Sequence, residues 1–414
     1  MQVRRPSFLT IYFRSLEEGD LAALLRGEVR ITRRFDPVAI TLLDREEHPL
    51  TANEMAALAR LPEDWVELSE VAAADRPEIA GLAARGVLLT RPGSLAPATA
   101  AGSDDETSDD GADARRRRDH ELAATAWNRH AAVYHYTSRW HGQYRPLPPS
   151  LDQVWNDPSP RLDSLVSVHG SPAPAFRERT PAAPYIDLPT PTPDGPLFDL
   201  LRERRVTRLY ERDADLPIDE LNLTLHTVWG AHGYRRLSAD LVVLRKTSPS
   251  AGALHPIEVY PVVRRVAGLE PGLYHYDVAG HGLELLRAMP HDDVSALAER
   301  LVAGQSYFAT AQVILIMTAR FSRTFWKYRE HSKAYRAVLF DAAHLSQTLF
   351  LTAAQLDRGA FITVAFNEVD IDDALGLDPY REGAIAVCGF GIKTLTGDGL
   401  ALNPAPYQPG RARP

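Results

Sequence analysis

Proline dominates the middle of the chain and divides the sequence into two parts. Of the 31 prolines, 13 fall between Pro146 and Pro196. Proline fixes φ and removes a backbone donor, so this stretch can form neither a helix nor a central strand. We expect an extended connector with a folded module before it and a larger domain after it. A length of 414 residues is enough for two or three domains.

Composition limits the classes of partner and compartment. The chain has 46 basic and 54 acidic residues, net charge −8, so it lacks the positive field that draws proteins to nucleic acid or anionic membranes. The single cysteine, Cys388, excludes an intramolecular disulfide and a cysteine zinc cage, and it fits a reducing compartment. No run approaches the roughly 18 apolar residues that span a bilayer, and Met1 to Arg14 lacks a signal-peptide core. We expect a cytoplasmic protein without a metal site.

Residues 1–100 are predicted to form a small module. Thr51-Ala-Asn-Glu54 is a capping box that opens a helix over 54–61, and further helices are predicted over 67–74 and 77–85. A strand over 87–90 follows Gly86. Helices followed by a strand favour a winged-helix-like module. It would either bind a peptide or DNA, or pack without a ligand of its own.

Opposed blocks of charge follow this module. Six carboxylates lie between Ser103 and Asp113, and residues 115–118 are four arginines. Charge blocks without aromatic residues predict a disordered linker over 101–118. A helical segment and the Pro-rich connector, 119–196, then lead to the larger domain at 197–395 and a tail at 396–414.

The larger domain mixes both kinds of secondary structure. Helices are predicted over 197–205, 218–229, 292–301 and 334–356, strands over 257–265, 312–318 and 384–388, and a hairpin over 272–286. Strands and helices do not alternate regularly, which makes the predicted fold class α+β.

Three separated segments could carry chemistry. Arg204-Arg205-Val-Thr-Arg208 could clamp a phosphate, although arginines at a helix end can also simply face water. Ser248-Pro-Ser-Ala-Gly252 begins a loop of small residues that would let a flat ligand approach the backbone, or that is only a tight connection. Lys327 and Tyr328 are residue types that exchange protons, but they would be inert on an exposed loop. His255, which precedes a proline, could brace its loop or titrate.

Together and in this order, these segments resemble a known family. They are similar to the SagB/ThcOx-type azoline dehydrogenase branch of the nitroreductase superfamily, and more narrowly to its peptide-maturation dehydrogenase group. The resemblance covers about half the chain and departs from the family at Val206, Arg358 and Ala360. Further matching positions are Tyr335-Arg336, His344, Gln347, Leu375-Gly-Leu377 and Val387-Cys-Gly-Phe-Gly391.

The resemblance implies an intertwined homodimer with an FMN-dependent nitroreductase-like domain. Lys327 and Tyr328 would be the catalytic residues. The implied FMN-binding residues are Arg204, Arg205, Arg208, Ser248, Pro249, Ser250, Ala251, Gly252, Gly389, Gly391 and Lys393.

The implied function is the oxidation of azolines to thiazoles or oxazoles in a ribosomally synthesised precursor peptide, with O2 reoxidising the flavin. A cyclodehydratase or another maturation enzyme would be a partner. Two alternatives remain open. One is an NAD(P)H-dependent flavin reductase of dehydroamino acids or nitro compounds, and the other is a non-catalytic peptide-binding scaffold.

Overall fold

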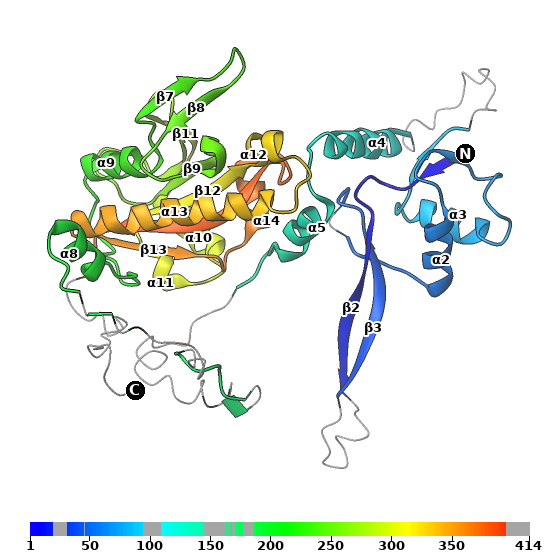
Figure 1. The fold of residues 1–414 in the computed structure, drawn as a ribbon, viewed down its shortest axis with the longest axis horizontal. Coiled ribbons are helices and arrows are strands. Elements are labelled where there is room, and N and C mark those ends of the chain that lie inside the picture. The colour runs from blue at the N-terminus through cyan, green and yellow to red at the C-terminus, as the bar shows by residue number, and fades with distance from the viewer. Residues whose placement is uncertain are drawn as a thin grey trace. The chain divides into compact units, whose positions relative to one another are not determined.

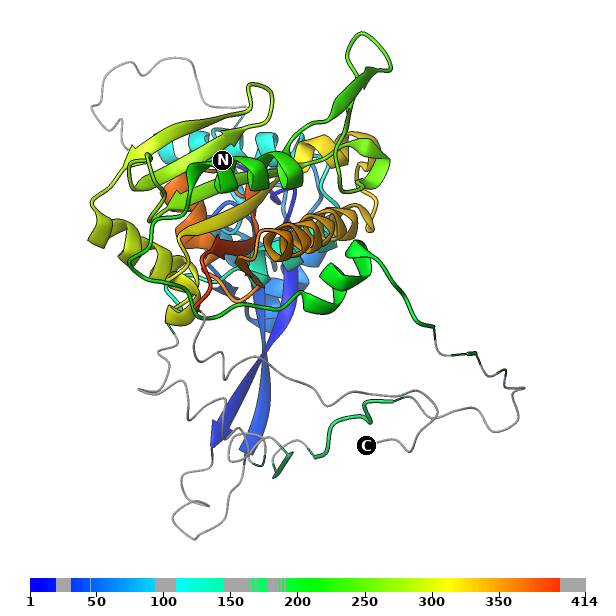
Figure 2. The ribbon, with the colours of Figure 1, turned by 90° about the vertical axis from the view of Figure 1, so that its left-hand side faces the viewer.

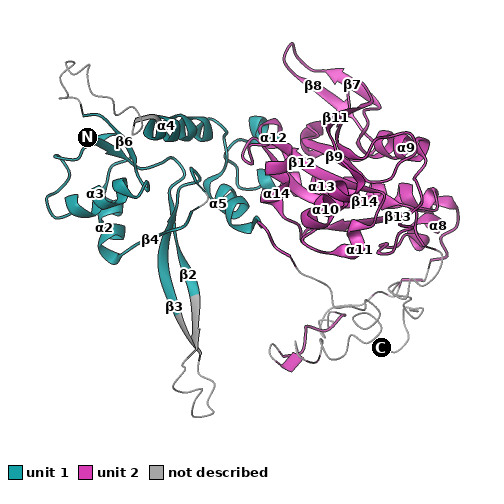
Figure 3. Cartoon of the chain, turned by 180° about the vertical axis from the view of Figure 1, so that it is seen from behind, with its two compact units in different colours: residues 1–139, 324–335 teal, residues 140–323, 336–414 magenta. Residues whose placement is uncertain are grey.

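The computed structural model describes residues 1–19, 31–44, 46–93, 109–144 and 191–394, with short stretches between 163 and 189. The chain forms two compact units (Figure 3). Unit 1 combines Met1–Arg139 with Thr324–Tyr335, and unit 2 combines Trp140–Arg323 with Arg336–Pro414. Most of the Pro-rich connector and all of the predicted tail lie outside the described residues.

The described part of unit 1 contains two small antiparallel sheets and several helices (Figure 1). The sheets have the strand orders β5-β1-β6 and β2-β3-β4. Helix α12 (Phe321–Tyr328) begins in unit 2 and ends in unit 1. The other elements are β1 (Gln2–Arg4), β2 (Thr10–Gly19), β3 (Ile31–Ile40), β4 (His48–Pro49), β5 (Val66–Glu67), β6 (Leu89–Arg91), α2 (Ala52–Arg60), α3 (Arg76–Ala84), α4 (Asp109–Ala123) and α5 (Arg129–Ser138).

Local signals explain one predicted helix of unit 1 and fail for another. The capping box is confirmed, because Thr51 Oγ1 accepts from the Glu54 amide at 3.2 Å while Glu54 Oε2 accepts from the Thr51 amide at 2.8 Å. The helix predicted over 67–74 is wrong. There, β5 is followed by turns whose carbonyls accept from the Arg76 guanidinium, at 2.8 Å for Ser69 and 3.0 Å for Val71. The side chain of Arg76 thus satisfies backbone groups that a helix would have paired.

Helix α4 corrects the predicted linker. The arginine run belongs to this helix, and residues 101–108 lie outside the described residues. Asp119, which is fully buried, accepts from the Ser7 amide at 2.7 Å and from Arg4 Nη2 at 2.5 Å. Arg116 donates to the carbonyl of Thr90. These partners lie far away in the sequence, so charge patterning alone could not identify them.

Unit 2 is built on a six-stranded antiparallel sheet with the order β11-β10-β9-β12-β14-β13 (Figure 1). A separate hairpin joins β7 to β8. The strands are β7 (Gly233–Arg236), β8 (Val242–Arg245), β9 (Ile257–Val263), β10 (Gly272–Asp277), β11 (Gly282–Ala288), β12 (Val313–Arg320), β13 (Gly359–Thr363) and β14 (Glu382–Gly391). The helices are α8 (Pro196–Glu203), α9 (Ile218–Trp229), α10 (His291–Leu301), α11 (Ser306–Ala309), α13 (Ala334–Gln355), the first two residues of which belong to unit 1, and α14 (Glu368–Leu375).

The core of unit 2 lies on the central strands. Every residue of β12 except Arg320 is buried, as its continuous apolar sequence requires. Helices α10 and α14 pack on one face of the sheet, and α13 runs along the other (Figure 2). Among the described residues, α13 is the one helix long and apolar enough to cross a membrane, and half of that apolar stretch is buried in the fold. The predicted α+β class is confirmed.

Candidate active site

The small-residue loop between β8 and β9 has an unusual backbone. Gly252, Ala253 and His255 have φ of +67°, +56° and +46°, in the left-handed region that side chains with a Cβ avoid. Two of these residues are not glycine. Such a conformation costs free energy and persists only where surrounding contacts hold it, as is common at functional sites.

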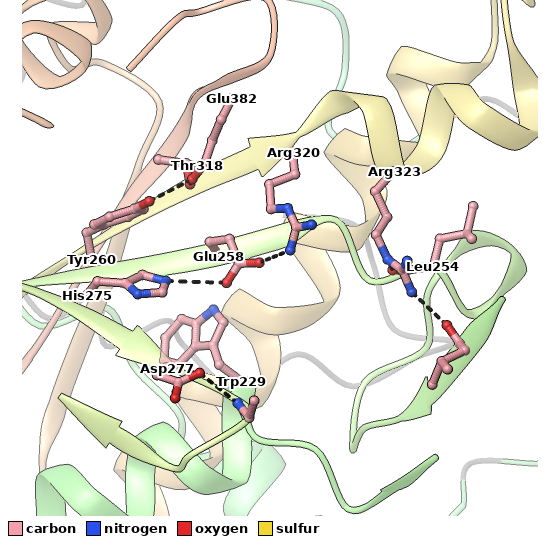
Figure 4. A network of polar contacts seen from close by, with 12 residues as sticks. Trp229, Leu254, Glu258, Tyr260, His275, Asp277, Thr318, Arg320, Arg323 and Glu382 are labelled. Carbon is pink, nitrogen blue, oxygen red and sulfur yellow. Dashed lines mark hydrogen bonds and ion pairs between the residues drawn. The ribbon is translucent and has the colours of Figure 1, made fainter. Parts of the chain in front are cut away.

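Helix α13 and the start of α12 supply contacts to this loop. The Ser248 and Thr348 hydroxyls lie 2.6 Å apart, and Thr348 is on α13. Arg323 donates from Nε to the Leu254 carbonyl at 2.8 Å and from Nη2 to the Val242 carbonyl at 2.9 Å (Figure 4). One guanidinium therefore ties the end of the loop to β8.

Lys246, just before the loop, and His255, near its end, have half-buried side chains. Burial lowers the pKa of Lys246 to about 8, and its Nζ donates to the Trp229 carbonyl at the end of α9 at 2.6 Å. Burial, reinforced by the charge of Lys246, lowers the pKa of His255 to about 4, so its imidazole is neutral at pH 7. Sequence reasoning missed Lys246, whose only signal is a lone charge between a strand and the loop.

The arginine segment lies at the end of α8. The Arg204 guanidinium lies 5.3 Å from the ring centroid of Phe350 on α13, while Arg205 is exposed. The backbone that follows runs beside the end of β14, because Tyr210 pairs with Lys393 and the Thr394 amide donates to the Leu209 carbonyl. The structure therefore places the backbone of Lys393 beside the residues that follow the arginine segment.

The two predicted cofactor glycines of β14 also have a role in packing. A Cβ on Gly389 would lie 2.0 Å from Phe361 Cε1, and one on Gly391 would lie 2.0 Å from Gln312 Oε1. Both glycines are buried in the sheet. Their missing side chains make room for the protein's own Phe361 and Gln312.

The Lys-Tyr pair ends α12 and belongs to unit 1. Lys327 is exposed, and its Nζ lies 5.5 Å from the ring centroid of Tyr328. The segment is held by Trp127, whose rings lie 4.7 Å from Phe325 and 5.6 Å from Tyr335. The structure thus places the pair and the small-residue loop in different compact units.

A network of polar side chains lies on the sheet below the loop. Glu258 on β9 contacts His275 at 3.6 Å and Arg320 at 3.0 Å (Figure 4). The ion pair with Glu258 raises the pKa of His275 to about 9, with a smaller effect from Glu284. Glu284 is nearer, at 2.8 Å, but it is 62% exposed and therefore better screened. His275 is protonated at pH 7.

Because of this ion pair, we expect the free energy of unfolding to fall at alkaline pH. The pKa of His275 is higher in the folded state than the value of about 6.5 expected when unfolded, so the stabilisation is full below pH 6.5 and is lost as the pH rises through 9. His275→Gln should flatten the fall in Tm between pH 6.5 and 9.5, removing on the order of 1 kcal/mol of pH dependence. Thermal denaturation against pH measures this, with the exposed His130→Gln as control. Equal slopes in wild type and H275Q would contradict it.

The described residues fit a flat ring with an anionic tail. The Thr348 hydroxyl bonds to Ser248 of the loop, and Phe350 lies against Arg204, so α13 contacts both the loop and the basic segment. The small side chains of the loop leave its backbone open to a planar group, and guanidinium groups suit a phosphate. This donor set fits the ring and phosphate of FMN.

Comparisons with known proteins agree with the fold of unit 2. The family model described as the nitroreductase family matches residues 201–392. The chain is 32% identical over 235 residues to trifolitoxin-processing protein TfxB of Rhizobium leguminosarum bv. trifolii, covering 55% of this chain and 61% of that protein. The matched region thus spans less than two thirds of that relative's length.

Two further proteins show the range of the similarity. A Methanocaldococcus jannaschii protein named as a nitroreductase, MJ1384, is 31% identical over 184 residues, which cover 44% of this chain and 86% of that one. The Escherichia coli microcin synthetase McbBCD complex with truncated pro-MccB17 bound has 18% identity and a TM-score of 0.47, covering 66% of this chain and 93% of that chain. On the family match and the extent of the MJ1384 alignment, this chain belongs to the nitroreductase family.

Proposed function

We propose that the protein is an FMN-dependent dehydrogenase that matures a ribosomally synthesised peptide by oxidising azolines to thiazoles or oxazoles. The observation that carries this is that both the strained loop and the basic segment contact α13, through Thr348 and Phe350, within a nitroreductase-family domain. The similarity to a protein named for trifolitoxin processing supports an action on peptides.

The chain's own residues would divide the work between binding and proton transfer. Arg204, Arg205 and Arg208, with Lys393, would bind the phosphate through charge-assisted hydrogen bonds. The loop from Ser248 to Gly252 would orient the ring. When bound, FMN supplies the hydride acceptor, and O2 supplies its reoxidation.

Lys327 and Tyr328 would handle the proton that leaves the azoline. Loss of a hydride from one ring carbon and a proton from its neighbour yields the aromatic azole, so the substrate loses two hydrogens. An amine can accept that proton, and a phenol hydroxyl can hold the substrate nitrogen or pass the proton on. The position of Lys327 beside the Tyr328 ring allows both groups to act on one substrate.

Exposed apolar side chains of unit 2 support the proposed homodimer. Helix α8 buries none of its residues, and Leu197 and Leu201 are 56% and 44% exposed. On α13, Phe340 is 65% exposed. Apolar surfaces of this kind are typical of protein–protein interfaces, and a second copy of the chain would cover them.

One preparation tests the proposed function. The purified chain should sediment as a dimer with one FMN per chain, and an azoline-bearing peptide incubated with it in air should lose two hydrogens by mass spectrometry. FAD in place of FMN, or a flavin-loaded monomer, would contradict the cofactor or the dimer. A gain of two hydrogens with NAD(P)H would instead indicate a reductase, and absence of flavin after reconstitution would indicate a scaffold.

A further inference from the structure

A buried carboxylate on α13 contacts the strained loop. Asp341 is 4% exposed, and its two oxygens accept from different loop groups. Oδ2 accepts from the Ser250 hydroxyl at 2.6 Å, and Oδ1 accepts from the Ala251 amide at 3.1 Å. Buried carboxylates are rare unless they are paired or hydrogen-bonded. The two hydrogen bonds from the loop therefore satisfy the Asp341 carboxylate.

Ser250 extends this contact across the left-handed residues. Its Oγ donates to Asp341 and accepts from the His255 amide at 2.9 Å. Two hydrogen bonds in series therefore connect Asp341 on α13 to the His255 amide through Ser250. They bridge Gly252 and Ala253, whose φ values are +67° and +56°. The hydrogen bonds fix both ends of the segment whose backbone conformation is unfavourable by itself.

The Asp341 carboxylate also lies near Lys246 and His255. Lys246, Ser250, His255 and Asp341 line one cavity of about 10 Å³, which has room for at most one water molecule. Burial raises the pKa of Asp341, while its two donors favour the ionised form. In so small a space, a negative charge affects neighbouring groups more strongly than it would in water.

We propose that Asp341 is a positioning residue of the flavin site, acting through Ser250 to hold the loop in the conformation that receives the isoalloxazine ring. This rests on the proposed function, because it takes the loop to be the flavin-ring loop. Asp341 would not touch the reacting atoms. It would set the shape of the loop and contribute a fixed negative charge beneath it.

Hydrogen exchange tests the bracing without any cofactor. In full-length protein freed of flavin, Asp341→Asn and Ser250→Ala should speed amide exchange at Ala251 and His255 by about 10-fold or more, because the acceptors of these amides are lost or weakened. Two matched controls should leave the loop unchanged. They are Asp292→Asn, at an exposed carboxylate of α10, and Ser346→Ala, at a buried α13 hydroxyl bonded only to its own helix.

The potential of bound FMN separates positioning from general stability. Two-electron reduction adds negative charge to the ring, so Asp341→Asn should shift the midpoint potential to more positive values, whereas Ser250→Ala, which keeps the carboxylate, should shift it much less. Both variants should raise the Kd for FMN, and the controls should not. Because Ser250→Ala removes only a hydroxyl, it keeps the test usable should D341N fold poorly.

Different results would contradict the role of Asp341 and the proposed function. Unchanged exchange at Ala251 and His255 in a protein that still binds FMN would overturn the role of Asp341 alone. Faster exchange with an unchanged potential and Kd would make Asp341 a purely structural residue and would also overturn the proposal. A wild-type chain that binds no FMN would overturn the proposed function first, whatever the exchange shows.

Discussion

Replacing Lys327 with alanine is expected to slow azoline oxidation by about 10²–10⁴-fold, the usual loss when a positioned acid or base is removed. FMN content and thermal stability should not change, because Lys327 is exposed and substitutions at such sites usually alter stability by less than about 0.5 kcal/mol. Tyr328→Phe, which keeps the ring but loses the hydroxyl, should show a loss of the same order if the hydroxyl handles the proton. Steady-state turnover with the flavin-loaded enzyme measures both.

Lys333→Ala is the matched control for this experiment. It removes another exposed lysine from the same segment of unit 1 and should retain wild-type turnover. Near-normal oxidation by K327A with FMN bound would mean that the base lies elsewhere. His255, which is neutral at pH 7, would then be the next residue to test, followed by Lys246.

Gly389→Ala is expected to destabilise unit 2 strongly. The added Cβ would lie 2.0 Å from Phe361 Cε1 and 2.7 Å from two further atoms of that ring. Phe361 is fully buried and is stacked on Phe308 with ring centroids 3.9 Å apart, so it has no space to move into. Overpacking of this kind costs about 1–3 kcal/mol or more, which corresponds to a fall in Tm of roughly 2–12 °C.

A second substitution makes this prediction specific. Phe361→Leu combined with Gly389→Ala should recover part of the lost Tm, because the smaller side chain vacates the space that the new methyl needs. Gly282→Ala, at a position with nothing within 4 Å of an added Cβ, should leave the Tm nearly unchanged. If G389A keeps its Tm but loses FMN, the glycine serves the cofactor, as the resemblance implied, and not the packing.

Local sequence signals predicted much of unit 2. Helix α9 has the predicted bounds, 218–229, and α13 begins at the predicted Ala334. Their apolar periodicity agrees with the burial that the fold imposes, so local and tertiary preferences coincide. The β7–β8 hairpin was missed because its strands are short and none of their residues is buried, which leaves little hydrophobic pattern to detect.

The candidate site was predictable in its segments but not in its connections. The arginine segment and the small-residue loop stand out by composition alone. The carboxylate that contacts Ser250 lies 91 residues away, on a helix whose sequence shows only an apolar pattern with one acid. Lys246 likewise becomes notable only when the fold buries it beneath the loop. Spacing in one sequence does not reveal contacts across such separations.

The return of residues 324–335 to unit 1 restricts how this architecture can be recombined. Trp127 packs on Phe325 and Tyr335, and the side-chain Nδ2 of Asn128 donates to the Glu330 carbonyl at 3.0 Å. If a foreign N-terminal module were fused at the connector, residues 324–335 would lack the partners on which they pack in this protein. The foreign module's own counterpart of 324–335 would have to be grafted with it. Because that segment ends α12 with Lys327 and Tyr328, the graft would also replace the proposed proton-transfer residues. Chimaeras made to change the recognition module are thus expected to inherit their chemistry from the module's donor and their cofactor contacts from the other parent.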